Sequence, residues 1–220
     1  MTVEPVDWNV VVVGHWNAAI LTPNGIAKRL LKVPEGTGIE VFIPIDLLGA
    51  PKVRYEDVTI QLSGQRLIVG TEKPDYQTLN KAAQTARNAL CSLPETPVLA
   101  AGLNIRFKLN NHPIDLDKIV DSVIDVKLSD AGYELISRGL TRTIRLKGGP
   151  FTKGVLNFSA VKDEKGVVKI ELNFHRDSKS TKELADWLNL SKESLEKEVT
   201  DTLSKIVPPI LEEMNHAGDS

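Results

Sequence analysis

Three histidines and two aspartates stand at predicted strand ends or breaks, and such side chains can bind a metal or transfer protons. His15 follows a run of valines, whereas His175 and Asp177 end another apolar run. His112 and Asp115 lie in a break near the middle of the chain. No two histidines have the i, i+4 or His-x-His spacing of a metal-binding pair. Separate loop histidines are therefore the simpler interpretation, and we expect no metal, no cofactor and no catalytic residue.

The segment His175-Arg-Asp-Ser-Lys179 resembles the catalytic loop of protein kinases. That loop carries an asparagine where this chain has Lys182, and the chain has neither a glycine-rich phosphate loop nor Asp-Phe-Gly. A strand end that runs into a helix cap is the simpler interpretation.

Asp117, Asp121 and Asp125 recur at steps of four residues, which places three carboxylates on one side of a helix. Such a stripe can clamp magnesium, but opposite an apolar stripe it is normally the solvated face of the helix. Cys91 lies on the apolar side of a helix end without a basic neighbour, so we expect a buried, inert thiol.

Basic residues recur along two predicted strands and suggest a basic sheet face for nucleic acid. They are Arg106, Lys108, Arg138, Arg142, Arg145 and Lys147. The chain as a whole has 27 basic and 29 acidic residues, a net charge of −2, so nucleic-acid binding is not favoured.

The 220 residues include 41% hydrophobic and 25% charged residues, which is the composition of a globular protein rather than a disordered one. One cysteine excludes a disulfide framework and a cysteine-built zinc site. Aromatic residues make up only 5%, which disfavours a site that stacks bases or sugars. The N-terminus has no signal-peptide pattern, and no apolar run is long enough to span a bilayer, so we expect a cytoplasmic protein.

Alternating or β-branched apolar residues predict the strands. These strands span residues 8–13, 39–45, 58–62, 65–71, 98–109, 134–147, 153–162 and 167–175. Both faces of the strand at residues 8–13 are apolar, which is typical of a central strand. Pro44 indicates an edge strand or a strand end, and Ser63-Gly64 predicts a hairpin turn.

In the strand at residues 98–109, one side is apolar and the other is polar. We expect Leu99, Ala101, Leu103, Ile105, Phe107 and Leu109 to face the core and Asn104, Arg106 and Lys108 to face away from it.

Helices are predicted by apolar steps of three and four residues and by their caps. They begin at Thr22-Pro23, span residues 75–93 and 115–126, begin again at Ser180, and span residues 195–210. Strands in hairpins and a final three-stranded meander give an α+β class, mostly antiparallel, with amphipathic helices packed on one face. We expect one domain over residues 1–220, with a possible subdivision near residues 110–113 into two strand-plus-helix halves.

Two segments, His15-Trp-Asn-Ala-Ala-Ile-Leu-Thr-Pro23 and Thr96-Pro-Val-Leu-Ala-Ala-Gly-Leu-Asn-Ile-Arg-Phe107, resemble segments of sporadically distributed, uncharacterised bacterial proteins. The resemblance covers mainly the first half of the chain and brings no assigned activity. It implies a prokaryotic, cytosolic accessory protein.

These observations favour a non-catalytic binding or assembly protein that contacts a protein partner or forms a homo-oligomer. The expected interaction face holds the polar side chains of two strands, namely Asn104, Arg106, Lys108, Lys169, Glu171 and Asn173. The alternative is a small-molecule-binding protein or enzyme with a cavity between a long C-terminal helix and a curved sheet. Its candidate pocket residues are His15, Trp16, Asn17, His112, His175 and Asp177.

Overall fold

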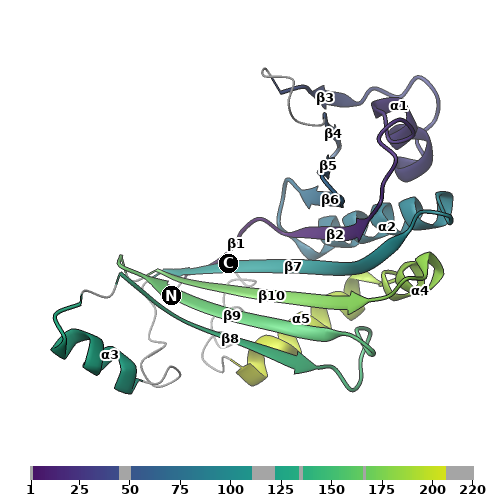
Figure 1. Ribbon diagram of the computed structural model, residues 1–220. Coiled ribbons are helices and arrows are strands. Elements are labelled where there is room, and N and C mark those ends of the chain that lie inside the picture. Colours follow the sequence, from purple (N-terminus) through teal and green to yellow (C-terminus); the bar gives the residue numbers. More distant parts are fainter. Residues whose placement is uncertain (1, 45–50, 111–121, 134–135, 166, 207–220) are drawn as a thin grey trace, which may run out of the picture.

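A computed structural model describes residues 2–44, 51–110, 122–133, 136–165 and 167–206 of the chain. Its strands form one ten-stranded antiparallel sheet in the order β3-β4-β5-β6-β2-β7-β10-β9-β8, and β1 also pairs with β7 (Figure 1). This arrangement confirms the predicted α+β class with an antiparallel sheet. It also confirms the central strand predicted at residues 8–13, and it places a strand over Glu40–Phe42, within the run predicted as an edge strand, at an edge of the sheet.

The strands are β1 (Thr2–Pro5), β2 (Asn9–Gly14), β3 (Glu40–Phe42), β4 (Lys52–Tyr55), β5 (Val58–Ser63), β6 (Arg66–Thr71), β7 (Val98–Asn110), β8 (Ser137–Arg145), β9 (Val155–Asp163) and β10 (Val168–Asp177). The helices are α1 (Pro23–Ile26), the π-helix η1 (Ala27–Leu31), α2 (Tyr76–Ser92), α3 (Ser122–Asp130), α4 (Thr181–Trp187) and α5 (Lys192–Ile206).

Side-chain caps begin three of these helices where the sequence predicts them. Thr22 Oγ1 accepts a hydrogen bond from Gly25 N–H, Asp75 Oδ1 from Thr78 N–H, and Ser180 Oγ from Glu183 N–H. Each bond satisfies a backbone donor that has no partner within the helix, and this fixes the first residue of the helix.

Strand β7 joins the two halves of the chain into one sheet, because β1 and β2 pair with it on one side and β10 on the other. The sheet therefore continues across the predicted subdivision near residues 110–113, and residues 111–113 themselves lie outside the described part. Between β1 and β2 the chain turns at Asp7, whose φ of +50° breaks the extended backbone.

One face of the sheet packs against α2, α4 and α5. Helix α2 contacts β2, β5 and β6, and α5 lies behind β8 to β10 in Figure 1. Val10 and Val12 of β2 are fully buried in this core, as are Leu195 and Val199 of α5. The buried apolar residues of α5 and of the sheet thus belong to one core. Among the described helices, α3 stands apart from this layer in Figure 1.

Some local predictions differ from the structure. Leu99 is 44% exposed, because a register shift opposite Val13 and Gly14 brings Val98 rather than Leu99 into the core. Cys91 is exposed rather than buried. The helix expected at residues 115–126 begins at Ser122 in the described part, and Asp117 and Asp121 lie outside that part.

The hairpin of β5 and β6 is confirmed, but its turn is one residue later than predicted. Ser63 pairs with Arg66, so Gly64 and Gln65 form the turn, and Gly64 has a φ of +57°. Strand β4 was not predicted, because its four residues mix basic and apolar side chains in a run too short for a clear period.

A stack of aromatic rings anchors the second half of the core. Phe151 and Phe174 lie 4.2 Å apart between ring centroids, and Trp187 lies 5.4 Å from Phe151. We expect Phe174→Ala to lower the free energy of unfolding by about 3–5 kcal/mol, because it leaves a cavity that rigid neighbours cannot fill. Urea unfolding would measure this loss.

Phe42→Ala is the matched control, because Phe42 is 47% exposed at the edge strand and contacts Arg54 across its ring. Its expected loss is below about 1 kcal/mol. Equal losses in the two variants would contradict this description of the core.

Candidate functional site

The second face of the sheet, opposite the helices, carries the polar side chains of β7 and β10. The strand register pairs Asn104 with Asn173, Arg106 with Glu171, and Lys108 with Lys169. Directly paired residues of an antiparallel sheet point to the same face. The six residues of the expected interaction face therefore form three neighbouring rows on what we call the helix-free face.

Arg106 lies at the centre of an ion-pair network on this face. Its Nη1 donates to Asp7 Oδ2 at 2.8 Å, and its Nη2 donates to Glu171 Oε1 at 3.0 Å. The turn at Asp7 brings that carboxylate over the neighbouring strand, so the break between β1 and β2 completes the network. The two carboxylates next to Arg106 are thus both bound to its guanidinium group.

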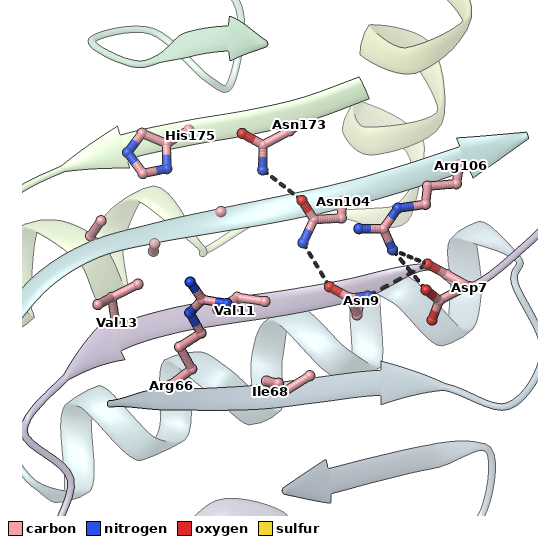
Figure 2. A pocket seen from close by; sticks show the side chains of 13 residues that line it. Asp7, Asn9, Val11, Val13, Arg66, Ile68, Asn104, Arg106, Asn173 and His175 are labelled. Carbon is pink, nitrogen blue, oxygen red and sulfur yellow. Dashed lines mark hydrogen bonds and ion pairs between the residues drawn. The ribbon is translucent and has the colours of Figure 1, made fainter. Parts of the chain in front are cut away.

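A ladder of side-chain amides crosses five neighbouring strands beside Arg106. Asn104 Nδ2 donates to Asn9 Oδ1 at 2.7 Å, and Asn173 Nδ2 donates to Asn104 Oδ1 at 2.6 Å (Figure 2). The ladder continues as Asn157 Nδ2 donates to Asn173 Oδ1, and Thr143 Oγ1 donates to Asn157 Oδ1. Each central amide keeps a second N–H and a second oxygen lone pair that can meet a partner.

Next to the ladder is a hollow of about 460 Å³ on the helix-free face. Its floor is apolar and small, because Val11 of β2 pairs with Gly102 of β7 and Val13 pairs with Ala100. Polar and charged side chains surround this floor, as Figure 2 shows. They are Asp7, Asn9, Arg66, Asn104, Arg106, Asn173 and His175.

His175 and Asp177 are the two candidate pocket residues that the structure brings into contact. The His175 Nε2 atom lies 3.0 Å from Asp177 Oδ1, and the histidine ring lines the hollow. An imidazole that gives its Nε2 proton to this carboxylate presents Nδ1 as its second polar atom.

The segment after His175 is a strand end that leads into the cap of α4, as the simpler interpretation predicts. Arg176 Nη2 and Ser178 Oγ each donate to Glu183 Oε2 at 3.0 Å. The hydrogen bond from Ser178 and then the charge of Arg176 hold the pKa of Glu183 below its usual value. These groups stabilise the junction of β10 with α4.

The other candidate pocket residues do not line this hollow. Trp16 packs against the core and its Nε1 donates to Val12 O at 3.1 Å, whereas His15 and Asn17 are exposed beyond the end of β2. His112 lies outside the described residues.

The basic residues weighed for nucleic-acid binding do not all lie on one side of the sheet. Arg142 pairs with Phe158, a buried residue of the helix-covered side, whereas Arg106 points to the helix-free face. In the described part of the chain, no cluster of three or more histidine, cysteine or acidic side chains is arranged to hold a metal ion. None of the helices within the same ranges has the length and apolar character needed to cross a membrane.

Sequence reasoning missed Asn9, Asn157 and Thr143 of the ladder and Arg66 and Gly102 of the hollow. Alternation within each strand indicates which side a residue faces, but not which residues of distant strands lie opposite each other. Asparagine is disfavoured in strands, so its presence in four paired strands was the signal that could have found the ladder.

In comparisons with known proteins, no family model matches the chain and no curated protein matches its sequence. The helix-free face is therefore interpreted from its own chemistry.

We expect Asn104→Asp to lower the free energy of unfolding by about 1–3 kcal/mol at neutral pH. The new carboxylate cannot donate to Asn9 Oδ1, so two acceptors would face each other across 2.7 Å. The loss should shrink below about pH 4, where a protonated carboxyl group can donate again. Urea unfolding over a range of pH values would measure it.

Asn17→Asp is the matched control, because exposed Asn17 uses only its side-chain oxygen, which accepts from Ala19 N–H. Aspartate can accept the same bond. A loss at Asn104 no larger than at Asn17, or one that does not change with pH, would show that the ladder does not stabilise the sheet.

Proposed function

We propose that this protein is a non-catalytic binding or assembly protein whose helix-free face is covered by a protein partner or by a second copy of the chain. The main support is the contrast between the two faces of one sheet. Three helices cover one face, whereas across β2, β7 and β10 the other face presents ladders of polar side chains to the outside.

The helix-free face carries positive and negative side chains in rows across neighbouring strands, which suits recognition of a polar protein surface. Lys108 lies directly opposite Lys169, with Glu4 of β1 on the other side of Lys108. Like charges that lie directly opposite each other on neighbouring strands destabilise a sheet. An acidic group of a partner would relieve that repulsion, so this lysine pair is a natural contact point.

The pairing of acidic and basic side chains on this face supports binding. Arg106 is held by Asp7 and Glu171, and His175 is held by Asp177. Such pairs fix the shape of a surface and set which partner charges fit it. The proposal includes a cytoplasmic, prokaryotic setting, which the resemblance of residues 15–23 and 96–107 supports.

A double variant, Lys108→Glu with Lys169→Glu, tests the proposal. We expect it to weaken the oligomer, or a complex that the wild-type chain forms, by at least about tenfold, because it places two new negative charges in the contact. Light scattering and native mass measurement over a range of protein concentrations would follow the oligomer. Quantitative co-purification from cells would follow a complex.

Lys179→Glu with Lys182→Glu is the matched control, because these two lysines are exposed outside the helix-free face. Lys179 precedes the cap of α4 and Lys182 lies in its first turn. The same change of charge there should leave the assembly intact. A wild-type chain that stays monomeric and brings down no partner contradicts the proposal, and so does an equal effect of the two double variants.

A small-molecule site is the second candidate function, and the hollow beside the ladder is the observation that favours it. Its volume of about 460 Å³ falls within the range of ligand pockets, roughly 300–1,000 Å³. It lies on the helix-free face, whereas the buried apolar residues of α5 belong to the core on the other face.

A further inference from the structure

The hollow exists because the outward side chains of β7 become small at one end. The outward residues are, in chain order, Ala100, Gly102, Asn104, Arg106 and Lys108. The side chain of Ala100 thus extends by one carbon atom above the sheet, and Gly102 has no side chain. The floor that they leave open lies between β2 and β10, next to Val11 and Val13.

Arg66 of β6 supplies the cation of this hollow. Figure 2 shows its side chain reaching over β2 toward the floor. Arg106, the other arginine of the hollow, is bound by two carboxylates. Within the described ranges, no acidic side chain forms an ion pair with Arg66. A guanidinium presents parallel N–H groups that fit a carboxylate with two hydrogen bonds.

Polar groups face Arg66 from the other side of the floor. His175 of β10 pairs in register with Gly102, and its Nδ1 would lie 3.7 Å from a Cβ placed on that glycine. The Asn173 amide nitrogen would lie 3.3 Å from the same point. A Cβ on Gly102 would also lie only 3.2 Å from Phe174 O, so a side chain does not fit there unless its neighbours shift, and the glycine keeps the floor low beside these two nitrogen atoms.

We infer that this hollow binds a carboxylate that carries a short aliphatic group. The carboxylate meets Arg66, and the aliphatic group lies on Val11, Val13 and the open surface above Ala100 and Gly102. The inference rests on the proposed function in one respect, namely that the helix-free face is the binding face. The carboxylate can come from a free organic acid or from the end of a docked polypeptide.

Nuclear magnetic resonance titration of the full chain with butyrate tests the inference. We expect shifts of the Gly102 amide and His175 ring signals, and a dissociation constant on the order of 1 mM, because the hollow is open and the ligand small. Butyramide has the same shape without the charge and should bind at least about tenfold more weakly.

Arg66→Gln should weaken butyrate binding at least about tenfold, since it removes the charge and the forked donors but keeps a shorter polar side chain. Arg29→Gln is the matched control, because exposed Arg29 lies on η1, away from the residues of the hollow. It should leave binding unchanged.

A second arm identifies the source of the carboxylate. It uses an acetylated peptide that ends in valine with a free C-terminal carboxylate, together with its amidated form. Binding of the acid peptide but not of butyrate, with loss in Arg66→Gln, supports a docked chain end. Binding of butyrate with the same dependence supports a free acid.

The inference is overturned if neither carboxylate moves the Gly102 signal. It is also overturned if the uncharged analogues bind equally well, or if Arg66→Gln binds as the wild type does. The lysine variants of the proposed function leave Arg66 unchanged. The two proposals can therefore fail separately. If the lysine variants do not change assembly but butyrate binding still depends on Arg66, the docking proposal is rejected and the carboxylate site is kept.

Discussion

The structure depends on the pairing of β7 with strands from both halves of the chain. One edge of β7 binds β1 and β2, and the other binds β10 over ten residue pairs from Val168 to Asp177. Its inward residues Leu103, Ile105 and Leu109 are fully buried. Because successive side chains of a strand point to opposite faces, the same strand must present Asn104, Arg106 and Lys108 on the other side. The core and the candidate site therefore lie on opposite faces of β7.

The amide ladder gives the helix-free face a defined shape. Asparagine in a strand costs stability unless its polar atoms have partners, and here each central amide both donates and accepts. The bonds run across the strands, so they add to the register that the backbone sets. Side chains held in this way lose little further freedom when a partner binds, which lowers the entropic cost of binding.

Local signals were sufficient to predict most elements of the fold. The caps at Thr22 and Ser180 and the alternation around Ile105 and Ile170 depend on residues close in the sequence, and the structure confirms them. The face of Asn104, Arg106, Lys108, Lys169, Glu171 and Asn173 followed from the same alternation.

The hollow could not be predicted in this way. Arg66 and His175 come from distant strands and approach the same floor only because β2 and β7 lie between β6 and β10. Strand order depends on long-range packing that no short sequence pattern contains. The prediction that Leu99 faces the core was wrong for a related reason, because the register shift near Gly14 reverses the alternation of side chains locally.

The central claim is that another protein surface covers the helix-free face, and lysine acetylation footprinting tests it most directly. The measurement compares the chain in gentle extracts of the cells that produce it with the isolated, dilute chain. The account predicts that Lys108 and Lys169 lose reactivity in the extract, whereas Lys179 and Lys182, outside that face, react equally in both. Equal reactivity of all four lysines in the two samples would contradict it.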